Sequence, residues 1–113
     1  MPVLVMKFGG TSVADLDRIE NAAEKIRRAV DRGYNVIVIV SAMSGKTNDL
    51  VGWVNQTSDF YDAREYDAVV SSGENITAGL MALRLQEMGI LARSWQGWQV
   101  PINTTSAHGA ARF

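Results

Sequence analysis

The sequence contains no cysteine and a single histidine, His108. Without thiols, neither a disulfide framework nor a thiolate metal site can form, and one histidine cannot make a metal cluster by itself. An excess of charge of one sign is also lacking, because 11 basic and 12 acidic residues give a net charge of −1. This balance offers no electrostatic footprint for nucleic acid or for an anionic membrane. His108 has no evident acid or nucleophile partner, so we assign it no catalytic role.

Long hydrophobic runs are absent as well. No run approaches the ~20 apolar residues of a membrane span, and no basic segment followed by a long apolar one opens the chain. We therefore expect a cytoplasmic protein. What is present, 113 residues with 47% hydrophobic and 20% charged side chains, is typical of one globular domain with a modest core.

The motif KFGGTSV at residues 7–13 follows an apolar run at 3–6 and precedes an amphipathic segment, so it predicts a strand, a glycine turn and a helix. Ligands bind at this end of parallel strands, where a helix amino terminus offers N–H groups to an anion. We expect Gly9 and Gly10 to use positive φ angles to aim their amides at phosphate oxygens, with Lys7 adding positive charge. The residues alone fit a plain tight turn with a solvated lysine equally well.

The next two segments predict a helix and a second strand. Apolar residues recur at helical spacing from Leu16 to Val30, with Ser12 or Asp15 as a cap and Gly33 as a stop. Residues 36–40 are continuously β-branched, as in a central parallel strand covered on both faces. Together with the first strand they form a right-handed βαβ unit.

The second loop, SAMSGKT at residues 41–47, ends like a P-loop. The P-loop pattern needs a glycine five positions before Gly45, and Val40 stands there, so we reject that interpretation. If the two strands are neighbours, Ser41 and Thr47 face the same cleft as the glycine turn. The alternative is that Thr47 or Asn48 only caps the following helix.

Residues 63–88 are again helical in pattern, with an interruption at SSGEN, residues 71–75. Glycine costs ~1 kcal/mol relative to alanine inside a helix, which predicts a break or a close approach there. Glu74 lies beside this glycine, and on composition alone it is a solvated charge. Residues 90–92 predict a third strand, and for Trp95 and Trp98 we favour packing over a stacking platform.

Together these motifs resemble those of the aspartate kinases, within the amino acid kinase family. The matching elements are KFGGTSV, SAM with a later threonine, SxGE before an alanine- and leucine-rich helix, and TxxxHGxAR near residue 108. The resemblance implies an α/β fold, a three-layer αβα sandwich with a mainly parallel sheet. It also implies transfer of the γ-phosphoryl group of ATP to the β-carboxylate of L-aspartate, giving 4-phospho-L-aspartate, the first step towards lysine, threonine and methionine.

The resemblance assigns roles to individual residues. ATP is the implied cosubstrate, and Mg²⁺ comes with it, held mainly by phosphate and water rather than by a protein metal site. The family motifs make Lys7 catalytic, Lys7, Gly9, Gly10, Thr11 and Ser41 ATP-binding, and Thr47 and Glu74 substrate-binding.

Aspartate kinases are longer than this sequence. The resemblance therefore implies that residues 1–113 form the amino-terminal portion of a kinase domain, without its remainder or the regulatory ACT domains, and that they are inactive alone. We expect a homo-oligomer or association with the rest of the enzyme. Alternatives are another amino acid kinase, such as one for glutamate, and a non-catalytic assembly module. A dinucleotide-binding domain is disfavoured because no GxGxxG follows the first strand.

Overall fold

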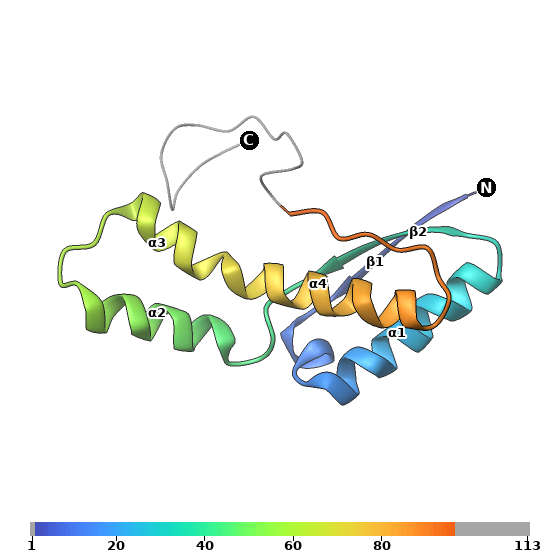
Figure 1. The fold of residues 1–113 in the computed structure, drawn as a ribbon, viewed down its shortest axis with the longest axis horizontal. Helices are drawn as coiled ribbons and strands as arrows, with labels where there is room; N and C mark the ends of the chain where they lie inside the picture. Colours follow the sequence, from blue (N-terminus) through green and yellow to red (C-terminus); the bar gives the residue numbers. More distant parts are fainter. Residues whose placement is uncertain (1, 97–113) are drawn as a thin grey trace.

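The computed structural model describes residues 2–96. Two parallel strands pair in register from Val3 with Asn35 to Phe8 with Val40, and the helix between them completes the predicted βαβ unit (Figure 1). In chain order the elements are β1 (Val3–Phe8), the short 3-10 helix η1 (Gly10–Val13), α1 (Leu16–Asp31), β2 (Asn35–Val40), α2 (Lys46–Thr57), α3 (Ala63–Val70) and α4 (Ser72–Glu87).

Helix α1 begins and ends where its sequence predicts. The Asp15 carboxylate accepts a hydrogen bond from the Arg18 backbone N–H at 2.8 Å, which satisfies a donor that the first helical turn leaves unpaired. At the other end, Gly33 adopts a φ of +94°, a left-handed conformation that favours glycine. The cap at Asp15 and the stop at Gly33 are thus confirmed.

Helices α1 and α4 cover one face of the sheet, and the hydrophobic core lies between these helices and the sheet. Half-buried strand side chains such as Met6, Val38 and Val40 pack against this core. An ion pair between Arg84 of α4 and Glu20 of α1, 3.0 Å long, joins the two helices at the surface, where such pairs add little stability. The buried core residues are Phe8, Val13, Ile19, Ala22, Ala23, Ile26, Met81 and Leu85.

The opposite face of the sheet is exposed. Val3 and Val5 of β1 are 60% and 57% exposed, and Ile37 and Ile39 of β2 are 54% and 47% exposed. The register pairs Val5 with Ile37 and Lys7 with Ile39, so these side chains share one surface. Among residues 2–96, therefore, two of the three expected layers are present, and the expectation that β2 is covered on both faces holds for one face.

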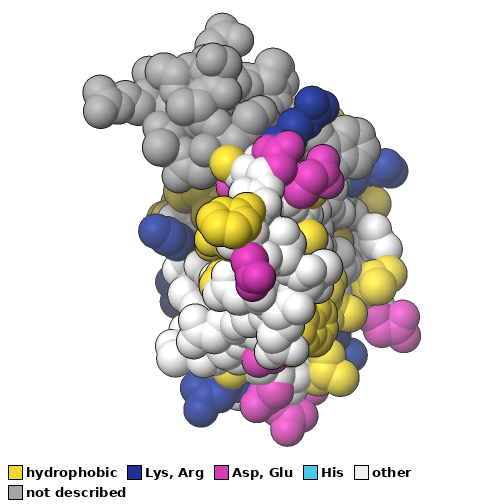
Figure 2. All heavy atoms as spheres, turned by 90° about the vertical axis from the view of Figure 1, so that its left-hand side faces the viewer, with side chains coloured by type: hydrophobic (Ala, Val, Ile, Leu, Met, Phe, Trp, Pro, Cys, Tyr) yellow, Lys and Arg dark blue, Asp and Glu magenta, His cyan; other side chains and the backbone are white. Residues whose placement is uncertain are grey.

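Helices α2 and α3 form a hairpin beside the sheet, at the left of Figure 1, and α4 runs from it along α1. The helical structure is interrupted at Ser71, between α3 and α4, as the sequence near Gly73 predicts. The rings of Tyr61 and Tyr66 stack in the hairpin with centroids 5.3 Å apart. Figure 2 faces this end of the molecule and shows hydrophobic side chains at the surface among acidic ones. Phe60, between α2 and α3, is 99% exposed.

The predicted third strand is wrong. Residues 90–92 form no strand, and the Leu91 side chain is fully exposed. The segment instead bonds back to the end of α4, because the Ile90 N–H donates to the Leu85 carbonyl at 3.0 Å and the Gln86 side chain donates to the Ala92 carbonyl at 2.8 Å. An apolar run becomes a strand only when a neighbour accepts its hydrogen bonds, and here the end of α4 takes them.

Trp95, for which we favoured packing, is 65% exposed. Trp98 and His108, together with the TxxxHGxAR motif, lie outside the described residues. Within residues 2–96, no helix combines the length and the apolar composition needed to cross a membrane.

Candidate functional site

The glycine turn is held between two buried anchors. Phe8, which ends β1, and Val13, which ends η1, both point into the core. Gly9 is extended, with φ −74° and ψ 172°, and its carbonyl accepts from the Ser12 N–H at 3.0 Å. The backbone of residues 9–12 is therefore fixed at the carboxyl end of β1, where the sequence predicts a ligand-binding turn.

The expectation of positive φ angles in this turn is wrong. Among the described residues only Gly33, Gly45 and Gly89 have positive φ. Space is limited at Gly10 instead, since a Cβ on it would lie 3.0 Å from the carbonyl oxygen of Ala42. A Cβ on Gly9 would meet no atom within 4 Å. The turn thus brings the backbone of residue 10 against the second loop.

Lys7 lies on the exposed face of the sheet, one residue before the turn. It pairs with Ile39 across the ladder, and the period-two alternation of β1 puts it opposite the buried Phe8. Its side chain is exposed at the strand end. Thr11 is exposed in η1, where its carbonyl accepts from the Arg18 guanidinium at 3.2 Å.

The second loop lies directly beside the glycine turn, as the neighbouring strands predict. The Ser41 N–H donates to the Phe8 carbonyl at 3.1 Å and continues the ladder beyond β2. The Ser44 N–H donates to the Gly10 carbonyl at 3.2 Å. Ser41 and the glycine turn, two of the predicted phosphate-binding elements, are therefore brought together by backbone hydrogen bonds.

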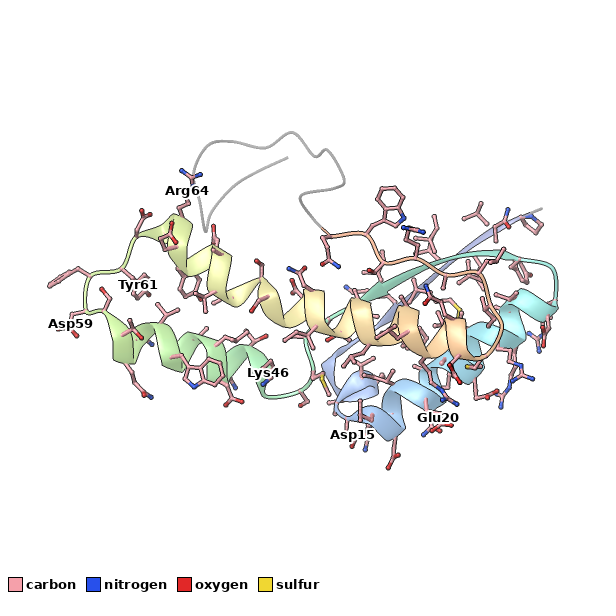
Figure 3. The ribbon with its side chains drawn as sticks, viewed as in Figure 1. Asp15, Glu20, Lys46, Asp59, Tyr61 and Arg64 are labelled. Atoms are coloured by element: carbon pink, nitrogen blue, oxygen red, sulfur yellow. The ribbon has the colours of Figure 1, made fainter. Side chains whose placement is uncertain are left out.

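The alternative in which Thr47 or Asn48 caps α2 is wrong. The helix begins at Lys46, after Gly45 at a φ of +82°, and neither Thr47 nor Asn48 acts as the cap. Thr47 is instead an exposed residue of the first helical turn. Lys46 extends its ammonium over the Trp53 ring, 5.7 Å from the centroid, a cation–π contact that sequence reasoning missed (Figure 3).

The third motif meets the second loop at Gly73. This glycine is buried in the first turn of α4, and a Cβ on it would lie 3.0 Å from the Ala42 Cβ and 3.2 Å from Leu50 Cδ1. The predicted close approach is confirmed. Glu74 follows in the same turn and is exposed, and a carboxylate at a helix amino terminus is favoured by the helix dipole.

The structure thus gathers the three motifs around one residue, Ala42, which sequence reasoning did not single out. Its carbonyl faces Gly10 and its methyl group faces Gly73. The signal in the sequence was the pair of glycines, whose contacts only the fold reveals. In residues 2–96, no group of three or more histidine, aspartate and glutamate side chains is placed to hold a metal ion.

Comparison with known proteins gives this arrangement a family. The model of the amino acid kinase family matches residues 2–108, nearly the whole sequence. The chain belongs to the amino acid kinase family. The aspartokinase of Pseudomonas aeruginosa is 47% identical over 113 residues, which is 100% of this chain and 27% of that protein. Aspartokinase 2 of Bacillus subtilis is 42% identical over 113 residues, 100% of this chain and 28% of the relative.

A solved structure agrees with the sequence relatives. The crystal structure of aspartate kinase from Synechocystis superimposes with a TM-score of 0.74 at 41% identity, and the match covers 78% of this chain and 15% of that one. The expected α/β fold, as the amino-terminal part of an amino acid kinase domain, is confirmed. The chain spans about a quarter of the length of the curated relatives that it matches.

Proposed function

We propose that these residues are the amino-terminal portion of the kinase domain of an aspartate kinase. The enzyme would transfer the γ-phosphoryl group of ATP to the β-carboxylate of L-aspartate and release ADP and 4-phospho-L-aspartate, at the entry to lysine, threonine and methionine synthesis in the cytoplasm. The observation that carries the proposal is the convergence of Gly10 and Gly73 on Ala42, which brings the glycine turn and the first turn of α4, where Glu74 lies, against one loop. The relatives named aspartokinase, identical at 42–47% of positions, support it.

The reaction needs positioning and charge stabilisation more than acid–base chemistry. An oxygen of the β-carboxylate bonds to the γ-phosphorus while the bond from that phosphorus to the β,γ-bridging oxygen breaks, and ADP leaves with the electron pair. The nucleophile is already anionic, so no general base has to remove a proton. Binding both substrates in line supplies much of the rate enhancement.

Each predicted site residue has a part in this scheme. The Lys7 ammonium and the N–H groups of Gly9 and Gly10 stabilise charge on the transferring phosphoryl group. Thr11 and Ser41 place their hydroxyl groups beside the ATP phosphates. Mg²⁺ supplied with ATP would be held mainly by phosphate and water and would neutralise phosphate charge.

Aspartate would occupy the side of the site formed by α2 and α4. Glu74 accepts hydrogen bonds from the substrate ammonium group, a charge-assisted contact, and Thr47 helps to orient the amino acid. The segments that hold the adenine and the α-carboxylate lie in the remainder of the kinase domain. We expect the enzyme to be a homo-oligomer.

The proposal is tested by coupled-assay turnover of the complete enzyme with ATP and a panel of amino acids. We expect ADP release with L-aspartate and little with L-glutamate, because the site fixes the distance from ammonium to carboxylate. Turnover with another acyl acceptor and none with aspartate would assign a different member of the amino acid kinase family. Absence of turnover with every amino acid would favour a non-catalytic assembly role.

A further inference from the structure

We propose that Ala42 is a positioning residue that sets the separation between the glycine turn and Glu74, and through it the preference for aspartate over the longer glutamate. This inference rests on the proposed function. Ala42 is the residue that both glycines approach: a Cβ on Gly10 would lie 3.0 Å from its carbonyl oxygen, and a Cβ on Gly73 would lie 3.0 Å from its methyl group. Its side chain is buried, 7% exposed.

The loop that carries Ala42 is fixed on the side of the glycine turn. The Ser41 N–H donates to the Phe8 carbonyl at 3.1 Å, and the Ser44 N–H donates to the Gly10 carbonyl at 3.2 Å. These two bonds hold Ala42 between them at a set distance from the turn. A larger side chain at residue 42 therefore presses on contacts that are already close, and the two hydrogen bonds of the loop oppose its movement.

The loop that carries Ala42 is also closely packed on the side that faces α4. Gly73 contacts Ala42 and Leu50, both buried, and its carbonyl accepts from the Thr77 hydroxyl at 3.1 Å. Thr77 is fully buried, and this bond links it to the first turn within α4. In a close-packed interior, added volume is transmitted to neighbours rather than absorbed. An enlarged contact between residues 42 and 73 displaces the first turn of α4, which carries Glu74.

This displacement matters because the substrate must span the site. In the proposed reaction the ammonium group binds at Glu74 and the β-carboxylate meets the γ-phosphoryl group at Lys7 and the glycine turn. The reacting atoms must approach to ~3–3.5 Å, so the span of the amino acid has to match the separation of the two anchors. Glutamate, one methylene longer, fits a wider separation than aspartate.

The test measures kcat/KM for aspartate and for glutamate in the complete enzyme. We expect Gly73→Ala, which adds a methyl group against Ala42, to lower the aspartate-to-glutamate ratio of kcat/KM by about tenfold, the lower end of the discrimination one methylene gives. Ala42→Val should shift the ratio in the same direction. In the double variant Ala42→Gly/Gly73→Ala the new methyl group fills the space vacated at residue 42, so the ratio should return to within about threefold of the unsubstituted enzyme.

Gly79→Ala is the matched control. It lies in the same helix as Gly73, and a Cβ there would meet no atom within 4 Å, so the ratio should not change. If Gly73→Ala lowers kcat/KM equally for both substrates, or if the double variant fails to restore the ratio, the spacing role of Ala42 is refuted while the proposed function stands. If the unsubstituted enzyme shows no turnover of aspartate, the proposed function itself fails.

Discussion

At the scale of single residues, the candidate site combines two kinds of residue, charged residues that are exposed and small residues that are buried or half-buried. Lys7 and Glu74 are exposed at the ends of rigid elements, where each can reach a ligand. At Gly10 and at Gly73 a Cβ would lie 3.0 Å from an atom of Ala42, so all three positions leave little room for a larger side chain. In the proposed site the charges would carry the chemistry, and the small residues would determine how far apart the charges lie.

Lys7→Ala in the complete enzyme should lower kcat by at least about a hundredfold, the usual cost of removing one preorganised group that stabilises developing charge. The KM for aspartate should change much less, because Lys7 acts on charge that develops in the transition state. Steady-state kinetics measures both constants. Lys25→Ala, on the exposed surface of α1, is the control, and a Lys7 variant defective only in KM would contradict the assigned role.

Glu74→Gln should instead raise the KM for aspartate about tenfold or more, since it weakens a charge-assisted hydrogen bond to the substrate ammonium in ground and transition states alike. ATP binding should be nearly unchanged. Glu87→Gln at the other end of α4 is the matched control, because it changes the same charge on an exposed residue away from the site. Equal losses for aspartate and ATP would make Glu74 a structural residue.

At the scale of the elements, the sequence predicts what depends on neighbours along the chain. The strand at residues 36–40, the cap at Asp15 and the break near Gly73 follow from local composition, and the structure has all three. The predictions that fail depend on contacts that composition does not show. The space at Gly10 is limited by Ala42, thirty-two positions later, and the Ile90 N–H and the Ala92 carbonyl bond to the end of α4 instead of to a strand.

Asp15→Ala should lower the free energy of unfolding by about 1 kcal/mol, because the Arg18 N–H loses its acceptor at the start of α1. Urea denaturation followed by circular dichroism measures the change. Asp15→Asn should retain most of the stability, since asparagine is as good a cap. Asp17→Ala, which removes the same charge two residues further on, should have a smaller effect. Equal losses of stability at positions 15 and 17 would show that the charge rather than the cap is responsible.

At the scale of the whole molecule, the sheet has one covered and one bare face. The bare face is an apolar surface beside Lys7, formed by Val3, Val5, Ile37 and Ile39. An uncovered sheet face of this kind is prone to association. The continuous β-branched run at residues 36–40 predicts a strand that is buried on both faces. In the structure only one face of the sheet is covered, and the side chains on the other face remain exposed. The sequence pattern cannot say what supplies that layer, because the partner lies outside the residues that form the pattern.

The isolated 113-residue chain should therefore self-associate, and its weight-average mass by light scattering should rise with concentration. Ile37→Lys should reduce the association, because it places a charge in the middle of the bare face without removing a buried contact. Leu16→Lys is the control, since Leu16 is 66% exposed but lies at the start of α1, away from that face. A chain that stays monomeric at every concentration would show that the bare face needs no cover.

The central claim is that the three motifs around Ala42 form one site for phosphoryl transfer to the β-carboxylate of aspartate. Trapping the product tests it most directly: the complete enzyme is incubated with ATP, Mg²⁺, aspartate and hydroxylamine, and the products are identified by mass spectrometry. We predict the β-hydroxamate of aspartate, formed from the acyl phosphate and lost in Lys7→Ala. ADP release without any hydroxamate, or a β-hydroxamate that Lys7→Ala forms at the original rate, would contradict the claim.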